Sequence, residues 1–175
     1  DMDVAVNISS SQFQSADLIE RIAETIQSTG MQESKLLFEM TESTLAESED
    51  READVLFHLR DMGIRISIDD FGIGFSSLAR LKRFPFIHLK VDGSFVREIT
   101  SCREDRALTK LIVDMAHTIG VTVTAEWVEN EDQLAVIKEI GCDFAQGYLI
   151  SPPLPADKFE DYLVTGNGFA RKLAA

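Results

Sequence analysis

Short apolar runs alternate with longer amphipathic stretches along most of this 175-residue chain. The apolar runs are rich in β-branched residues and predict strands at residues 4–9, 36–40, 65–69, 88–91, 122–125 and 144–146. Between them, apolar residues recur at helical spacing and predict helices at residues 17–29, 50–62, 108–119 and 132–140. Strands that alternate with helices are typical of βα units around a parallel sheet, so we expect an α/β fold.

Glycine residues mark the ends of these helices. The glycines directly after an amphipathic stretch are Gly30, Gly63, Gly120 and Gly141. Glycine closes a helix because it readily adopts the left-handed backbone conformation. This regularity favours one compact domain over residues 1–165, followed by a tail at residues 166–175. A closed parallel barrel usually has about eight strands. We therefore predict an incomplete TIM-like (β/α) barrel with about six βα units, the earlier units lying upstream of Asp1.

The charge balance excludes some classes of ligand. Acidic residues outnumber basic ones by 30 to 17, which gives a net charge of −13 and argues against binding a nucleic-acid polymer. A small anionic ligand can still bind if cations intervene. Cys102 and Cys142 form no metal-binding pattern, and two reduced thiols are typical of a cytoplasmic protein. No apolar run is long enough to cross a bilayer, although upstream segments could anchor the parent protein.

Polar residues stand where the predicted strands end. They are Asn7, Glu39, Asp69, Asp70, Lys90, Glu126 and Gln146. In a parallel barrel the carboxyl ends of the strands open onto one face, where active sites are built, so these side chains should converge. Any one of them alone is more often a helix cap or turn residue than a ligand. Their repetition at successive strand ends indicates a functional site.

Two of these positions are more specific than the others. Asp69 and Asp70 are adjacent carboxylates, which repel each other unless a cation or a proton intervenes. Lys90 places a positive charge inside an otherwise mostly apolar strand. Because all the acidic and amide candidates offer oxygen, the set favours a hard cation such as Mg²⁺ or Mn²⁺. A zinc site would need suitably placed His or Cys residues.

At these residues the sequence resembles the EAL domain family. The matching segments are VNIS at residues 6–9, FEMTES at 38–43, IDDFGIGFSSL at 68–78, KVD at 90–92, AEWVE at 125–129, and CDFAQGY at 142–148 with PLP at 153–155. The resemblance extends over essentially the whole chain. It implies the C-terminal two-thirds of a domain that hydrolyses the bacterial second messenger cyclic di-GMP to linear pGpG.

The resemblance also implies a site with two Mg²⁺ or Mn²⁺ ions. Asn7, Glu39 and Asp69 would hold the first ion, and Asp69 would bridge to a second ion that Asp70 also binds. Glu126 would be a ligand of the second metal or the general base. Lys90 would steady the attacking water or the developing negative charge.

Further residues would support this site. Glu129 and Gln146 would orient water and metal ligands. A mobile loop at residues 71–78 would cover the substrate, and its expected members are Phe71, Gly72, Gly74 and Ser76. The resemblance implies that Glu42 anchors this loop, although a capping residue for the following helix is the alternative reading.

The sequence departs from the family pattern in three places. The Glu-Ala-Leu strand, whose Glu would complete the first metal site, is not among these residues, which puts the activity of this chain alone in question. Trp127 replaces the usual glycine after Glu126, where its ring would stack on a guanine or crowd it. Ile73 replaces the usual threonine of the loop. Neither of these two replacements removes a matching metal ligand.

Two other functions compete with hydrolysis. The first is a degenerate module that binds cyclic di-GMP without cleaving it and signals to a partner. Against it, the chain retains the residues that such relatives usually lose: Glu39, Asp69, Asp70, Lys90 and Glu126. The second is a Mg²⁺-dependent barrel enzyme that uses Lys90 as a base for proton abstraction. The resemblance further implies an upstream sensor or GGDEF-type domain, and pairing into a homodimer through helices near the loop.

Overall fold

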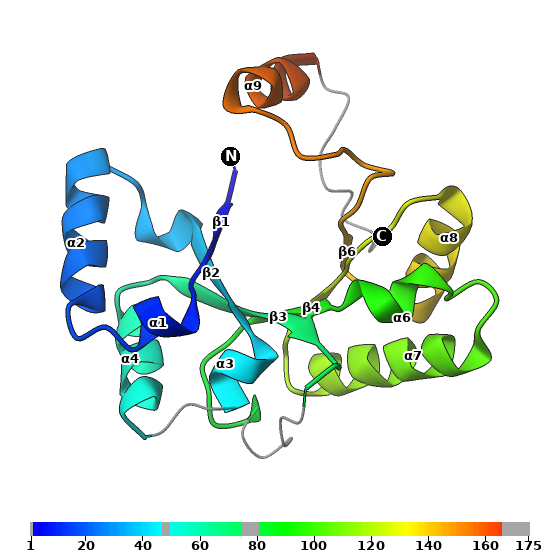
Figure 1. The fold of residues 1–175 in the computed structure, drawn as a ribbon, viewed down its shortest axis with the longest axis horizontal. Helices are drawn as coiled ribbons and strands as arrows, with labels where there is room; N and C mark the ends of the chain where they lie inside the picture. Colours follow the sequence, from blue (N-terminus) through cyan, green and yellow to red (C-terminus); the bar gives the residue numbers. More distant parts are fainter. Residues whose placement is uncertain (1, 47–49, 75–80, 166–175) are drawn as a thin grey trace. The chain divides into compact units, whose positions relative to one another are not determined.

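The computed structural model describes residues 2–46, 50–74 and 81–165, and everything below refers to these residues. The predicted tail and Ser76 lie outside them. The chain divides into two compact units, residues 1–89 and 90–175. In the described residues, the strands of each unit follow one another in the order of the sequence, β1-β2-β3 in the first and β4-β5-β6 in the second (Figure 1). This order is the one that successive βα units produce.

The first unit contains three parallel strands and the helices between them. Its elements are β1 (Val4–Asn7), α1 (Ser10–Phe13), α2 (Leu18–Thr29), η1 (Glu33–Lys35), β2 (Leu36–Thr41), α3 (Glu42–Ala46), α4 (Asp50–Asp61) and β3 (Arg65–Phe71). Strand β2 pairs in parallel with β1 on one side and with β3 on the other. The buried core forms where α4 packs on β3, with Leu56 and Leu59 from the helix and Ile66 and Ile68 from the strand.

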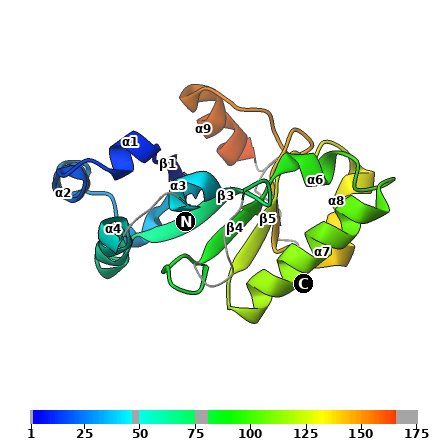
Figure 2. The same ribbon diagram turned by 60° about the horizontal axis from the view of Figure 1, so that its bottom comes forward.

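The second unit begins inside β4 and repeats the same pattern. Its elements are the end of β4 (His88–Val91), α6 (Gly93–Arg97), α7 (Arg103–Thr118), β5 (Thr122–Ala125), α8 (Glu131–Ile140), β6 (Phe144–Ala145) and α9 (Ala156–Thr165). Strand β5 pairs in parallel with β6. Helix α7 contacts β5 and α8, and Figure 2 shows α7 beside α8. Their apolar faces bury Val113, Leu134 and Ile137.

A buried glutamine ties the start of α8 to α6. The side-chain oxygen of Gln133 accepts hydrogen bonds from the backbone N–H groups of Glu129 (2.7 Å) and Asn130 (3.2 Å). Its amide nitrogen donates to the carbonyls of Val96 (3.3 Å) and Arg97 (3.1 Å). Since Gln133 is only 4% exposed, these bonds are shielded from water and fix the segment after β5.

The predicted strands and long helices are confirmed, with changes at their ends. The strand expected at residues 4–9 stops at Asn7, because Ser9 and Gln12 form a capping box that begins α1. The helix expected at residues 108–119 begins earlier, at Arg103, with Glu104 and Asp105 in its first turn, where the helix dipole favours acidic side chains. Helix α9 is not predicted by any pattern in the sequence. No helix in the described ranges is long and apolar enough to cross a membrane.

The packing of α8 predicts a large difference between two leucines of the second unit. Leu134 on α8 is 4% exposed, whereas Leu111 on α7 is 65% exposed. Leu134→Ala should lower the free energy of unfolding by about 2 to 5 kcal/mol, because it leaves a cavity. Leu111→Ala should change it by less than about 0.5 kcal/mol. Urea denaturation followed by circular dichroism measures both values, and equal losses would contradict this packing.

Candidate active site

Three strand-end residues of the first unit share one face of the sheet. Asn7 on β1 is the register partner of Glu39 on β2, and Thr41, two residues further along β2, is the partner of Asp69 on β3. Side chains two residues apart on a strand lie on the same face, so Asn7, Glu39 and Asp69 do too. Glu39 is buried, Asp69 is half-buried and Asn7 is exposed. The side-chain oxygens of these three residues thus line the carboxyl ends of three adjacent strands.

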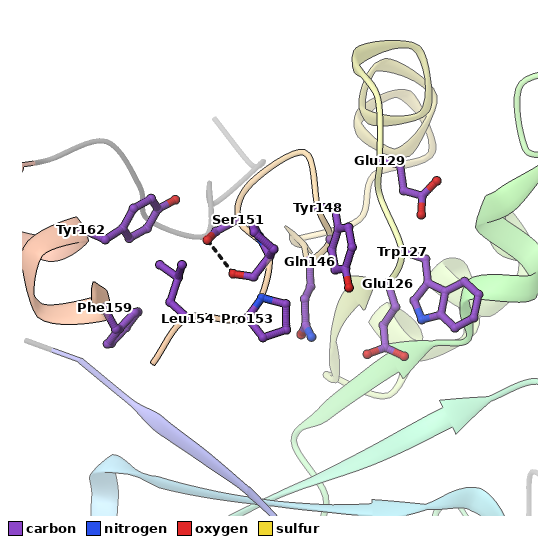
Figure 3. Close-up of a pocket in the computed structure, with 12 residues that line it drawn as sticks. Glu126, Trp127, Glu129, Gln146, Tyr148, Ser151, Pro153, Leu154, Phe159 and Tyr162 are labelled. Carbon is purple, nitrogen blue, oxygen red and sulfur yellow. Dashed lines mark hydrogen bonds between the residues drawn. The ribbon is translucent and has the colours of Figure 1, made fainter. Parts of the chain in front are cut away.

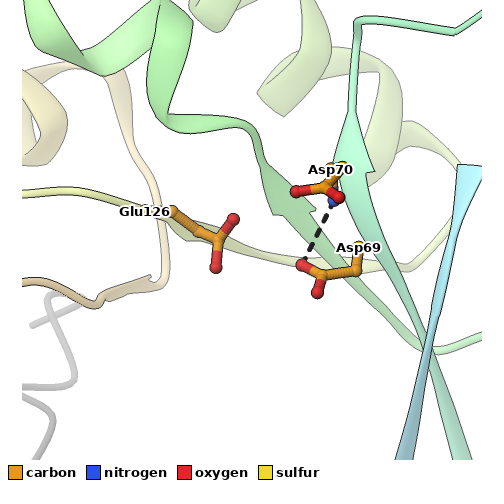
Figure 4. Close-up of side chains that lie close together, drawn as sticks. All are labelled: Asp69, Asp70 and Glu126. Carbon is orange, nitrogen blue, oxygen red and sulfur yellow. Dashed lines mark hydrogen bonds between the residues drawn. The ribbon is translucent and has the colours of Figure 1, made fainter. Parts of the chain in front are cut away.

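The backbone turns sharply at the next residue. Asp70 has a φ of +53°, in the left-handed region, which aspartate tolerates better than most residues. Its N–H donates a 3.1 Å hydrogen bond to Oδ1 of Asp69 (Figure 4). In a regular strand, neighbouring side chains point to opposite faces. With this turn, Asp69 and Asp70 instead offer carboxylate oxygens within 4.8 Å of each other, close enough to share a cation.

Glu42 holds the segment that follows β3. It is the first residue of α3 and only 3% exposed. One of its carboxylate oxygens accepts hydrogen bonds from the N–H groups of Gly72 and Gly74, each 3.0 Å long. A Cβ at Gly74 would lie 2.8 Å from this carboxylate, so a larger residue would disturb the contact. Phe71, another expected loop residue, is buried at the end of β3.

The second unit contains a buried ion pair at its strand ends. The ammonium nitrogen of Lys90, on β4, lies 2.7 Å from Oε1 of Glu126, directly after β5, and the two side chains are 6% and 10% exposed. The N–H of Glu126 donates to the carbonyl of Val91, which holds the two strand ends together. Two charges removed from water in this way are tolerated only when they compensate each other.

A cavity of about 610 Å³ adjoins this ion pair within the second unit. Figure 3 shows its polar side chains, Glu126, Glu129 and Gln146, near the ring of Tyr148. The rest of the lining is mostly apolar or aromatic and consists of Trp127, Gly147, Ser151, Pro152, Pro153, Leu154, Phe159 and Tyr162. Apolar walls with a few polar groups are typical of sites for small organic ligands.

Gly147 allows the two wall segments to approach closely. The N–H of Val128 donates to the carbonyl of Gln146, and the N–H of Leu149 donates to the carbonyl of Val128, each at 3.0 Å. A Cβ on Gly147 would lie 2.2 Å from the carbonyl oxygen of Val128. The φ of Gly147 is +158°. Only glycine fits between them, which places Gln146 and Tyr148 on the cavity wall.

Neither cysteine belongs to this site. Burial raises the pKa of the Cys142 thiol to about 12, and the Asp143 carboxylate adds to this effect. The thiolate is the reactive form of cysteine, so at neutral pH Cys142 is an inert core residue. Cys102 is partly exposed at the start of α7, away from the cavity lining.

The comparisons with known proteins identify the family. The chain belongs to the EAL domain family, whose model, described as the EAL domain, matches residues 1–153. It is 42% identical over 164 residues to the signaling protein YkoW of Bacillus subtilis, covering 94% of this chain and 20% of YkoW. It is 38% identical over 158 residues to the bifunctional diguanylate cyclase/cyclic di-GMP phosphodiesterase MucR of Pseudomonas aeruginosa, covering 90% of this chain and 23% of MucR.

Solved structures resemble this chain in fold as well as in sequence. The PaMucR phosphodiesterase in complex with c-di-GMP matches with a TM-score of 0.86 and 38% identity, over 90% of this chain and 64% of that one. Klebsiella pneumoniae BlrP1, in a manganese/cyclic di-GMP complex at pH 9.0, matches with a TM-score of 0.80 and 31% identity, over 86% and 39% of the chains. The expected fold class, an incomplete TIM-like (β/α) barrel, is confirmed. The chain spans about a fifth of the length of YkoW and of MucR.

The Glu42 contacts predict a local change in backbone protection. Glu42→Ala removes the acceptor of two amide hydrogens, so the amides of Gly72 and Gly74 should exchange with solvent about tenfold faster or more. Hydrogen–deuterium exchange read by NMR measures this change. Glu24→Ala, at an exposed position on α2, is the matched control and should leave these amides unaffected. Unchanged exchange in Glu42→Ala would show that the carboxylate does not hold this segment.

The two thiols should differ in reactivity. At pH 8, iodoacetamide should alkylate Cys102 first and leave Cys142 unmodified, because Cys142 is buried and protonated at any pH well below about 12. Mass spectrometry of tryptic peptides distinguishes the two sites, and unfolding in guanidinium should make both react. Rapid alkylation of native Cys142 would contradict the buried thiol.

Proposed function

We propose that the protein hydrolyses cyclic di-GMP to linear pGpG with the help of divalent metal ions. The observation that supports this most directly is the buried Lys90–Glu126 pair, which places an acid–base group on a cavity large enough for nucleotide parts. The names of the relatives add support, since MucR is called a cyclic di-GMP phosphodiesterase and the PaMucR structure contains c-di-GMP. Because this chain spans only part of these proteins, the activity is proposed for the full-length protein.

The residues present fit a hard divalent cation. In the first unit, Asp69 and Asp70 can each offer one carboxylate oxygen to a metal ion (Figure 4), and Glu126 offers a further carboxylate in the second unit. Asn7 and Glu39 add an amide and a carboxylate oxygen on the face of the sheet that Asp69 shares. Such oxygen ligands suit Mg²⁺ and Mn²⁺. We propose that Asn7, Glu39 and Asp69 hold one ion and that Asp69, Asp70 and Glu126 hold the other. Bound cations would neutralise the phosphodiester charge and lower the pKa of water.

The chain's own groups supply the remaining steps. Glu126 accepts the proton of the attacking water, for which its carboxylate at the cavity wall is suitably placed. Lys90 balances the charge of Glu126 and donates a hydrogen bond to the negative charge that develops on the phosphodiester. Glu129 and Gln146, on the same wall, orient water and the substrate. Glu42 keeps the segment at Gly72 and Gly74 in place beside the acidic pair.

We propose that this domain is one of several in the full-length protein. This chain spans about a fifth of the length of YkoW and of MucR. We therefore expect further domains in the full-length protein, such as a sensor or a GGDEF-type domain. We also propose that the domain works in the cytoplasm and pairs into a homodimer. Size-exclusion chromatography with light scattering on the full-length protein tests the pairing.

Activity of the full-length protein tests the proposed reaction. With Mg²⁺ or Mn²⁺, chromatography should detect pGpG as the product of cyclic di-GMP. Glu126→Gln keeps the size of the side chain but removes its basicity, so the rate should fall by about 10²- to 10⁴-fold. Glu131→Gln, in the exposed first turn of α8, is the matched control and should keep the wild-type rate.

Two outcomes would contradict this function. Absence of pGpG with either metal would exclude the phosphodiesterase. A full rate in Glu126→Gln would exclude the assigned role of that carboxylate. Tight binding of cyclic di-GMP without metal or turnover, unchanged by Asp69→Asn, would instead identify a binding module that signals to a partner.

A further inference from the structure

The side chain of Trp127 occupies an unusual place in the cavity wall. Its φ is +56°, in the left-handed region that bulky residues rarely adopt. The side chain is 51% exposed, and it lines the cavity together with Glu126 and Tyr148 (Figure 3). A left-handed backbone at a bulky residue is strained, and the half-exposed ring recovers only part of the free energy of full burial.

One face of the indole ring is covered by α6. A Cβ built on Gly93 would lie 2.2 to 2.7 Å from three atoms of the five-membered ring, so the ring lies flat against the Cα of Gly93. The guanidinium carbon of Arg97 lies 5.0 Å from the ring centroid. Gly93 and Arg97 are four residues apart on the same helix and therefore lie on the same side of it.

The opposite face of the ring is therefore the exposed one. Gly93 and Arg97 both approach the ring from α6, and the cavity adjoins the remainder of the side chain. The packing on Gly93 and the cation–π contact hold the ring in one orientation before any ligand binds. A ring that is already ordered loses little conformational freedom on binding, which favours stacking with a planar partner.

We propose that the open face of Trp127 is the stacking platform for one guanine base of cyclic di-GMP. This inference rests on the proposed function and adds a residue that determines substrate affinity. Stacking between bases and aromatic side chains is favourable for any base, and it needs no hydrogen bond to the base. Because Trp127 directly follows Glu126, a base stacked there would hold the adjoining phosphodiester near the catalytic carboxylate.

Steady-state kinetics of the full-length protein test this platform. Trp127→Ala should raise the KM for cyclic di-GMP by about 5- to 100-fold and leave kcat within about threefold, because stacking stabilises the bound substrate and its transition state alike. Trp127→Phe keeps an aromatic face on the same backbone and should stay within about threefold of the wild-type KM. Equal KM values for all three proteins would overturn the proposal.

A second variant tests the orientation of the ring without removing it. Gly93→Ala introduces a Cβ that would displace the indole, so it should raise KM in the wild-type background but have little effect when combined with Trp127→Ala. Trp127 is also the single tryptophan of this chain, so cyclic di-GMP should quench the fluorescence of the 175-residue protein. Additive effects of the two substitutions, or binding without a change in fluorescence, would contradict stacking.

These outcomes separate the inference from the function on which it rests. If the wild type hydrolyses cyclic di-GMP and Trp127→Ala keeps the wild-type KM, only the stacking platform is wrong. If the wild type binds but does not hydrolyse, the phosphodiesterase is wrong, and dissociation constants from calorimetry then replace KM in the same comparison. If the wild type neither binds nor hydrolyses the dinucleotide, both are wrong.

Discussion

The buried ion pair between Lys90 and Glu126 is the interaction on which the candidate site depends. Removing one partner of such a pair from a protein interior typically costs about 3 to 5 kcal/mol, because the other charge is left uncompensated. The pair exists because β4 and β5 end side by side, with the N–H of Glu126 bonded to the carbonyl of Val91. The regular βα pattern of the second unit thus keeps two opposite charges in contact away from water.

The described chain has two non-glycine residues in the left-handed conformation, and each places functional groups at the end of a strand. At Asp70, the turn brings two consecutive carboxylates together instead of onto opposite faces of β3. At Trp127, the same conformation follows directly after the catalytic candidate Glu126. Strained backbone of this kind persists where the surrounding structure enforces it, and here capping and close packing do so. Gln133 bonds the segment after β5, and Gly147 packs against Val128.

Much of the fold and part of the candidate site could be predicted from the sequence. The strands and long helices follow from local periodicity, and the strand-end positions of Asp69, Lys90 and Glu126 follow from it in turn. The contact between Lys90 and Glu126 could not be predicted from periodicity, because it joins residues 36 positions apart. Helix α9 and the cavity residues Phe159 and Tyr162 were also missed. They follow the last predicted strand, where no repeating pattern marks them.

The sequence by itself determined the order of strands and helices, the oxygen-rich ligand set and the resemblance to the EAL domain. These properties depend on residues that are near one another along the chain. Only the tertiary structure decided how Glu42 reaches Gly72 and Gly74, and which face of Trp127 lies against α6. Contacts of this kind are set by strand register and helix packing, which bring distant residues together and leave little trace in local sequence patterns.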